Sequence, residues 1–310
     1  MPALATYSEF PITSRQRFVA VAVGNKVYCP ASGQAFCGVI DTMTNTYSEF
    51  PIPARTFNTG VLVGTKIYMP ASGQAFCGVI DTTTNTYSEF PITSRQRNKT
   101  VLVGTKLYCL SFNGFFSTVI DTTDNTYTEI PDNFSTGTSA ILVGTKIYVP
   151  SPVIGVGTLV LDTTTNTSTY ISTPAFNYGK SILAGSKIYV LPGSDDRLTV
   201  IDTVTNTFTT DRKTSQFNNT PTPHLWQGTI FAPRFNTPYY GEFTPGDTAT
   251  LTGVVQWPAT SRQFVGTALV GNKIYCPANL QGICGVFTLP LPPDPPVTLG
   301  IYRDGRVHLS

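Results

Sequence analysis

The chain has 310 residues, with 20 Lys and Arg against 18 Asp and Glu, so its formal net charge at pH 7 is only +2. Without a concentrated basic stripe, this charge argues against nucleic-acid binding. No run of about eighteen apolar residues occurs, which argues against a transmembrane helix and membrane insertion. The first residues show no basic stretch followed by an apolar one, so no signal peptide is expected, and a cytoplasmic or particle-associated location is favoured. Charged residues make up 12% of the chain, about half of the usual fraction, and this suits an assembled structural protein.

A unit of about forty residues recurs along the chain. Its most regular marker is a turn glycine, found at Gly24, Gly64, Gly104, Gly144, Gly185, Gly228 and Gly271. Seven copies at this period predict a β-propeller or another repeat array. A closed ring of repeats is one domain however long it is, so the chain is expected to form a single large domain.

Each copy predicts four strands, as the first copy illustrates. An apolar segment at 18–23 precedes a Gly-Asn turn, whose residues are typical of a two-residue hairpin. Lys-Val-Tyr-Cys-Pro at 26–30 predicts the second strand, and a loop of about seven residues leads to the third, which ends in Val-Ile-Asp at 39–41. An Asp-Thr-x-x-Asn-Thr turn then leads to Tyr-Ser-Glu-Phe at 47–50. No segment has a helical period, so the fold class is all-β.

The two ends of the repeat region complement each other. Residues 5–12 match the end of a copy, 45–52, while the seventh copy, 264–288, lacks that segment. We therefore predict a seven-bladed β-propeller of four-stranded blades over residues 5–288. In it the N-terminal strand, 5–12, completes blade seven and leaves no open sheet edge.

A different composition follows residue 288. Residues 289–300 are rich in proline and predict a stiff spacer, and residues 301–310 predict a small hairpin with an Asp-Gly turn. A lone hairpin is marginally stable, so this tail is expected to dock, either on its own propeller or on a neighbouring chain. The tail, 289–310, could thus attach the propeller to a larger assembly.

The repeat resembles a known family. Gly-x-Lys-Ile-Tyr followed by Val-Ile-Asp-Thr-x-Thr-Asn-Thr-Tyr is similar to the kelch repeat and to related short propeller repeats, over residues 5–288. Two features differ: Pro-Ala-Ser stands at 30–32 where kelch repeats carry two glycines, and Tyr47 stands where they carry tryptophan. The resemblance implies the propeller fold.

The sequence offers no catalytic constellation. His224 and His308 lie in unrelated settings, and no His/Cys group has the spacing of metal ligands. The aspartate of each copy begins a turn and is interpreted as a turn residue. We therefore expect no catalytic residue, no metal and no cofactor.

The six cysteines follow the repeat. Cys29 and Cys37 are eight residues apart, as are Cys276 and Cys284, so each pair could form a disulfide across a hairpin. Around the ring the position of Cys29 also holds Met, Val and Ala, which is typical of a small buried apolar site and favours free thiols.

Arginine marks one end of the predicted ring. Arg15, Arg55, Arg95 and Arg262 occupy one equivalent position, in the loop after the fourth strand. The remaining candidates lie beside them or in the loops between second and third strands at the same end: Arg17, Arg97, Gln34, Gln74, Gln281, Phe36 and Phe76. Arginine with aromatic residues is typical of interface anchors and of carboxylate or phosphate recognition. The alternative is that each arginine pairs with Glu49, Glu89 or a backbone carbonyl.

Three functions remain open from the sequence. The first is a non-catalytic binding or assembly module that presents this Arg/Gln/aromatic face to a protein or an acidic ligand, for example as a structural component of a particle such as a virion. The second is a propeller enzyme, of hydrolase or lyase type, acting at the mouth of the central channel. The third is an intracellular kelch-like adaptor, which would normally carry a second domain.

Overall fold

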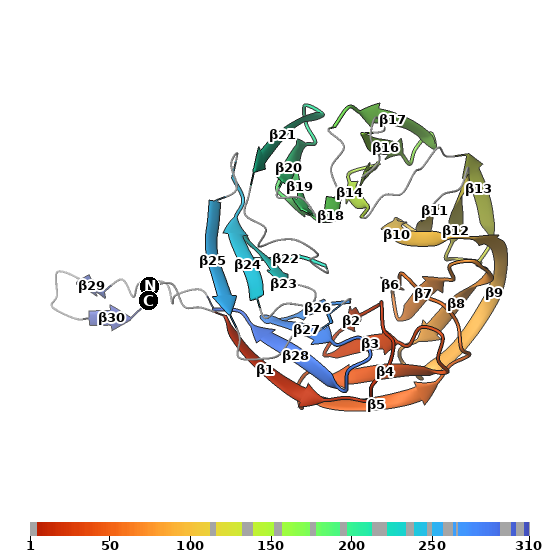
Figure 1. The fold of residues 1–310 in the computed structure, drawn as a ribbon, viewed down its shortest axis with the longest axis horizontal. Helices are drawn as coiled ribbons and strands as arrows, with labels where there is room; N and C mark the ends of the chain where they lie inside the picture. The colour runs from red at the N-terminus through yellow and green to blue at the C-terminus, as the bar shows by residue number, and fades with distance from the viewer. Residues whose placement is uncertain are drawn as a thin grey trace.

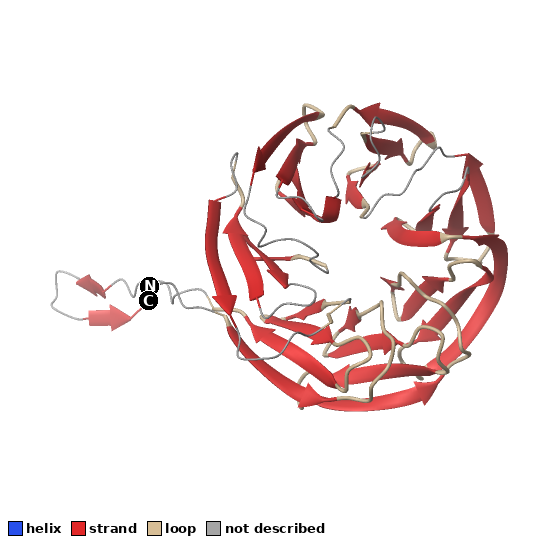
Figure 2. Ribbon diagram, in the orientation of Figure 1, coloured by secondary structure: helices blue, strands red, loops and turns tan. Residues whose placement is uncertain are grey.

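The structure is a computed structural model that describes residues 5–111, 116–131, 139–151, 157–173, 178–192, 197–212, 222–233, 239–246, 250–256, 263–264, 266–291, 299–301 and 307–309. Its strands form seven four-stranded antiparallel sheets, arranged around a centre as the blades of a β-propeller (Figure 1). The predicted all-β, seven-bladed fold is confirmed, and Figure 2 shows strands joined by loops. None of the described residues belongs to a helix long and apolar enough to cross a membrane.

Blades 1 to 6 each consist of four consecutive strands, the first of which lies nearest the centre of the ring (Figure 1). Blades 1 and 2 contain β2 (Val21–Val23), β3 (Lys26–Pro30), β4 (Phe36–Asp41), β5 (Thr46–Pro51), β6 (Val61–Val63), β7 (Lys66–Pro70), β8 (Gln74–Asp81) and β9 (Thr86–Arg95). Blades 3 and 4 contain β10 (Arg97–Val103), β11 (Lys106–Ser111), β12 (Phe116–Asp121), β13 (Tyr127–Pro131), β14 (Ile141–Val143), β15 (Lys146–Pro150), β16 (Thr158–Asp162) and β17 (Thr167–Ile171). Blades 5 and 6 contain β18 (Tyr178–Ala184), β19 (Lys187–Pro192), β20 (Arg197–Asp202), β21 (Thr207–Arg212), β22 (His224–Trp226), β23 (Thr229–Pro233), β24 (Tyr239–Thr244) and β25 (Thr250–Gln256).

Blade 7 joins the two ends of the ring. Its strands are β26 (Ala268–Val270), β27 (Lys273–Pro277) and β28 (Ile283–Thr288), and β1 (Thr6–Pro11) from the N-terminus completes it. Strand β1 pairs antiparallel with β28, with Thr6 opposite Thr288 and Pro11 opposite Ile283. The N-terminal strand therefore covers the edge that β28 would otherwise leave open.

The start of the proline-rich segment packs on the ring. Leu289 is buried in the core between blades 6 and 7, and the indole Nε1 of Trp226 donates a hydrogen bond of 3.1 Å to the carbonyl of Pro290. Beyond it, β29 (Leu299–Ile301) and β30 (Val307–Leu309) pair as a two-stranded hairpin, which Figure 1 draws clear of the ring. The residues of the expected Asp-Gly turn lie outside the described residues, and where the hairpin docks stays a prediction.

The turns follow the expected chemistry, with one correction. At the turn between the third and fourth strands of blade 1, the Asp41 carboxylate accepts hydrogen bonds from the backbone N–H of Met43 and Thr44. These bonds hold the pKa of the Asp41 carboxyl below its usual value, and Asp81, Asp121, Asp162 and Asp202 show the same lowering. In blade 6 the first residue of the hairpin turn is Gln227, with φ of 47°, and Gly228 comes second, so the glycine marker is shifted there by one residue.

The core lies between the blades. Seven clusters of buried apolar side chains occur among the described residues, and each joins two neighbouring blades. Between blades 1 and 2, for example, Val39 and Tyr28 of blade 1 pack with Ile67 and Met69 of blade 2. A blade is thus apolar on both faces and depends on both neighbours for burial.

A tyrosine clasp links most neighbouring blades at the end of the ring that carries the hairpin turns. The hydroxyl of Tyr28 in blade 1 donates to the carbonyl of Thr82 (3.1 Å) or to Oδ1 of Asn85 (2.8 Å), both in a turn of blade 2. The tyrosine hydroxyls that reach the next blade in this way belong to Tyr28, Tyr68, Tyr108, Tyr148, Tyr189 and Tyr275. In blade 6, Phe231 takes this position, and the imidazole Nε2 of His224 instead lies 2.8 Å from Oγ1 of Thr267 in blade 7.

The asparagine of the clasp occupies an unusual backbone conformation. Asn45, Asn85, Asn125, Asn166 and Asn206 have φ between 53° and 61°, in the left-handed region. Asparagine tolerates this region better than other residues with a Cβ atom. The same residue therefore both completes its own turn and offers Oδ1 to the tyrosine of the preceding blade.

Removing the hydroxyl of Tyr275 should weaken ring closure, because this hydroxyl bonds the carbonyl of Thr42 (3.0 Å) across the junction of blades 7 and 1. We expect Tyr275→Phe to lower the free energy of unfolding by about 1 kcal/mol, measured by urea denaturation. The matched control is Tyr127→Phe, which should cost less, because Tyr127 is 39% exposed and its hydroxyl lies 3.3 Å from the exposed hydroxyl of Thr93. Equal losses from both variants would contradict the clasp.

Candidate functional site

Arg15, Arg55 and Arg95 lie on three consecutive blade junctions at the end of the ring opposite the tyrosine clasps. Each backbone is fixed by the preceding blade, since the N–H groups of Leu280, Gly33 and Gly73 donate to the carbonyls of Arg15, Arg55 and Arg95, respectively. The bonds measure 2.9, 2.8 and 2.7 Å. Leu280, Gly33 and Gly73 all have positive φ, so these loops share one conformation, which glycine adopts without strain.

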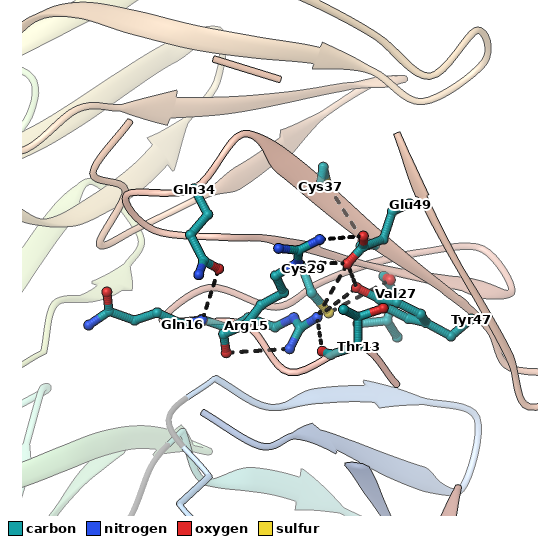
Figure 3. Close-up of polar contacts among 11 residues, drawn as sticks. Thr13, Arg15, Gln16, Val27, Cys29, Gln34, Cys37, Tyr47 and Glu49 are labelled. Carbon is teal, nitrogen blue, oxygen red and sulfur yellow. Dashed lines mark hydrogen bonds and ion pairs between the residues drawn. The ribbon is translucent and has the colours of Figure 1, made fainter. Parts of the chain in front are cut away.

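Each of the three arginine side chains pairs with a glutamate of the following blade. Nε and Nη2 of Arg15 donate to the two carboxylate oxygens of Glu49 at 3.1 and 3.0 Å (Figure 3). Arg55 pairs with Glu89 at 2.9 Å, and Arg95 pairs with Glu129 at 2.7 Å. The structure thus shows the pairing with Glu49 and Glu89 that the sequence left open as an alternative. Each arginine connects two blades, because its backbone carbonyl is bonded to one blade and its guanidinium to a glutamate of the next.

The same guanidinium groups lie over phenylalanine rings. Cζ of Arg15 is 4.4 Å from the ring centroid of Phe36, Cζ of Arg55 is 4.3 Å from that of Phe76, and Cζ of Arg95 is 5.3 Å from that of Phe116. Phe36 and Phe116 are 36% and 40% exposed, and Phe76 is partly exposed. We call these six residues, Arg15, Arg55, Arg95, Phe36, Phe76 and Phe116, the arginine face.

Arg17 and Arg97 lie inside the protein and do not contribute to the arginine face. They are 1% and 0% exposed. Nη2 of Arg17 donates to the carbonyl of Thr13 (2.8 Å) and to the hydroxyl of Tyr47 (2.6 Å), while Nη2 of Arg97 donates to Oγ1 of Thr118 (2.7 Å). Both Nε atoms are buried without a hydrogen-bond partner. Burial in this setting lowers the pKa of Arg97.

The predicted glutamine side chains accept hydrogen bonds from the backbone of neighbouring loops. Oε1 of Gln34 accepts a hydrogen bond of 3.3 Å from the backbone N–H of Gln16, as Figure 3 shows. Gln74 and Gln281 accept equivalent bonds from Thr56 and Gln263. Their carbonyl oxygens therefore have partners within the protein. Arg262, the fourth arginine of the predicted set, lies outside the described residues.

Sequence reasoning missed one member of this site, Phe116, and one partner, Glu129. Phe116 occupies the repeat position of Phe36 and Phe76, so the repeat alignment could have found it, and Glu129 likewise follows Glu49 and Glu89. The burial of Arg17 and Arg97 also had a signal. At their repeat position the other copies carry Phe57 and Phe264, which are 1% and 0% exposed, and such an exchange is typical of an interior site.

The cysteines are free and buried in the structure. Burial raises the pKa of the Cys29 and Cys109 thiols to about 12, and it raises the pKa of Cys37, Cys77, Cys276 and Cys284 well above the usual value. Among the residues that the structure describes, no group of three or more His, Cys, Asp or Glu side chains could hold a metal ion.

Known proteins share the fold but little of the sequence. No protein family model matches the chain, so membership of the kelch family is not confirmed, and no curated protein matches it either. Among solved structures, virginiamycin B lyase from Staphylococcus aureus matches with a TM-score of 0.75 at 13% identity, covering 92% of this chain and 99% of that one. A streptogramin B lyase matches with a TM-score of 0.75 at 13% identity over 93% and 98% of the two chains. A chain of a mitotic checkpoint complex matches with a TM-score of 0.73 at 10% identity over 93% of each. At these identities the likeness shows the propeller fold.

The Arg15–Glu49 pair predicts a pH dependence of stability. The hydrogen bond from Arg15 is the largest cause that lowers the pKa of the Glu49 carboxyl below its ordinary 4.5. The pair therefore stabilises the fold above pH 4.5, and this contribution is lost as the pH falls through the lowered value. We expect Glu49→Gln to reduce the urea midpoint at pH 6, and we expect its difference from the wild type to shrink as the pH falls below 4.5. A constant difference at all pH values would show that the charge is unimportant.

The buried thiols should be unreactive. Because the thiolate is the reactive form and all six groups are buried, we expect no labelling of the native protein by a thiol reagent such as dithiobis-nitrobenzoate. After unfolding in urea without reductant, all six thiols should react. A count of four or two would instead reveal a disulfide, as between Cys29 and Cys37 or between Cys276 and Cys284.

Proposed function

We propose that this protein is a non-catalytic binding module that recognises a protein partner through the arginine face. The observation that carries the proposal is the row of three arginines, each held between a glutamate and a partly exposed phenylalanine ring on consecutive blades. Aromatic and arginine side chains are the usual anchors of protein interfaces. The propeller neighbours include a chain of a multiprotein complex, which agrees with this class of function.

The arginine face is already organised before any partner binds. Each arginine backbone is bonded to one blade and each guanidinium to the next, so little side-chain freedom remains to be lost on association. Anchors that are fixed in advance bind more tightly because the entropic cost of ordering them is smaller. The rigid spacing of the row then selects a partner surface of matching shape.

A protein partner fits better than a small acidic ligand. The carboxylates of Glu49, Glu89 and Glu129 already neutralise the arginines, and an acidic ligand would have to displace them. A protein surface can instead pack on the exposed edges of Phe36 and Phe116 and leave the ion pairs intact. Assembly into a larger particle, such as a virion, is one setting for such a contact.

The test is capture from the organism of origin with immobilised wild type and two matched variants. The face variant carries Phe36→Ser, Phe76→Ser and Phe116→Ser. The control variant carries Lys26→Ser, Lys66→Ser and Lys106→Ser, at the equivalent turn positions at the other end of the same three blades. We expect a protein that the wild type and control retain and the face variant loses, with melting temperatures of the variants within a few degrees.

The captured protein must then be purified and sedimented with the wild-type chain. A stoichiometric complex that the face variant does not form supports the proposal. Equal retention by all three baits, or retention lost with the lysine variant instead, contradicts it. Turnover of a small molecule that survives in the face variant would favour the second candidate, an enzyme at the channel mouth.

A further inference from the structure

Leu280 has a backbone conformation that leucine rarely adopts. Its φ of 54° lies in the left-handed region, where a Cβ atom crowds the backbone. At the same position of the loop between the second and third strands, blades 1 and 2 carry Gly33 and Gly73, with φ of 68° and 72°. Glycine adopts this conformation without that crowding. Leucine therefore makes the loop of blade 7 more strained than glycine would.

The fold does not need a leucine at this position. The structural task of the residue is a hydrogen bond from its backbone N–H to the carbonyl of an arginine, and Gly33 and Gly73 make that bond as Leu280 does. A Cβ atom added to either glycine would meet no atom within 4 Å other than those of its chain neighbours, so a side chain here projects from the loop. Leu280 is accordingly 58% exposed and gains little from burial. Strain that packing does not offset points to a function outside the fold.

The loop holds the backbone of Leu280 in a fixed position. The N–H of Asn279 donates to the carbonyl of Gln263 at 2.7 Å, and Oδ1 of Asn279 accepts a hydrogen bond of 3.1 Å from the N–H of Arg17. The N–H of Leu280 itself donates to the carbonyl of Arg15 at 2.9 Å. The segment that carries the leucine is thus ordered before any partner binds, which reduces the entropic cost of association.

Leu280 lies beside the arginine face. Its N–H bonds the carbonyl of Arg15, whose guanidinium lies 4.4 Å from the ring centroid of Phe36 and pairs with Glu49. The junction of blades 7 and 1 therefore presents an aliphatic side chain, a partly exposed aromatic ring and a guanidinium whose charge is neutralised. Such a surface fits an apolar recess of a protein. It suits a nucleic acid or a small anion less well, because these need positive charge that is available for pairing.

We propose that Leu280 is the apolar anchor of the protein contact at the arginine face and inserts into an apolar recess on the surface of the partner. The anchor adds two points to the proposed function, on which it rests. The contact includes the junction of blades 7 and 1, and the partner offers aliphatic or aromatic side chains around a recess of leucine size. Leu280 then stabilises the complex while it strains the free chain, as residues at functional sites commonly do.

The experiment measures, by calorimetry, the affinity of the purified captured protein for variants of the full chain. Leu280→Asn removes the apolar group and keeps a residue that tolerates the left-handed conformation. We expect this variant to bind at least about tenfold more weakly than the wild type. It should melt no lower, because asparagine relieves strain.

The matched control is Met43→Asn. Met43 is also a large apolar residue, 78% exposed, and it lies in a turn at the other end of blade 1. Its replacement should leave the affinity for the captured protein unchanged. Equal loss of affinity in Met43→Asn and Leu280→Asn would show that any exposed apolar side chain matters, and would overturn the proposal.

The remaining outcomes separate this anchor from the proposed function. Unchanged affinity of Leu280→Asn, beside loss of binding by the variant with three phenylalanines replaced, overturns the anchor and leaves the proposed function standing. A melting temperature well below that of the wild type would show that Leu280 is structural, and overturns it too. Failure of every bait to retain a protein contradicts both. A dimer of the wild-type chain alone, seen in sedimentation and abolished by Leu280→Asn, would place the recess on a second copy and overturn the partner named here.

Discussion

The dependence of every blade on its two neighbours governs this structure. Both faces of a blade are apolar, and the seven buried clusters lie between blades and not within them. A single four-stranded sheet of this kind would expose an apolar face on either side. The closed ring buries both faces of every blade, because each blade packs between two neighbours, and closing it covers the last two faces at once.

Polar links between blades act at both ends of this apolar packing. At one end the tyrosine hydroxyls reach the turns of the next blade, and at the other end the arginines join the backbone of one blade to a glutamate of the next. At the closure of the ring, the hydroxyl of Tyr275 in blade 7 donates the equivalent hydrogen bond to the carbonyl of Thr42 in blade 1. The junction of blades 6 and 7 differs, since Phe231 replaces the tyrosine and His224 meets Thr267. There burial lowers the pKa of His224 to about 4, so the imidazole is neutral near pH 7.

The arginine face follows from the same constraint. Its arginines stabilise the fold through their ion pairs with Glu49, Glu89 and Glu129. The guanidinium groups and the phenylalanine rings remain partly exposed. A surface that the fold itself keeps rigid is suited to recognition, because its shape does not depend on the partner.

The sequence predicted the elements that repeat and not the contacts that cross between repeats. The match of residues 5–12 to 45–52 was enough to predict the closing strand, because strand identity is local. The partner of Tyr28 is Asn85, which is 57 residues away, and nothing in the local pattern indicates that distance. Arg15 and Arg17 looked alike in sequence, yet one is partly exposed and the other is buried. Only the phenylalanines at the repeat position of Arg17 distinguish them.

Native-state hydrogen exchange across the whole chain tests the central claim most directly, namely that the ring is closed by β1 and unfolds as one unit. In a closed ring, the slowest amides of β1 and β28 should exchange with the same free energy as those of β7 and β8 in blade 2, because opening any junction exposes the blades beside it. Exchange of β1 at a much lower free energy, with blade 2 still protected, would contradict it. The ring would then be an open array with a loosely attached first strand.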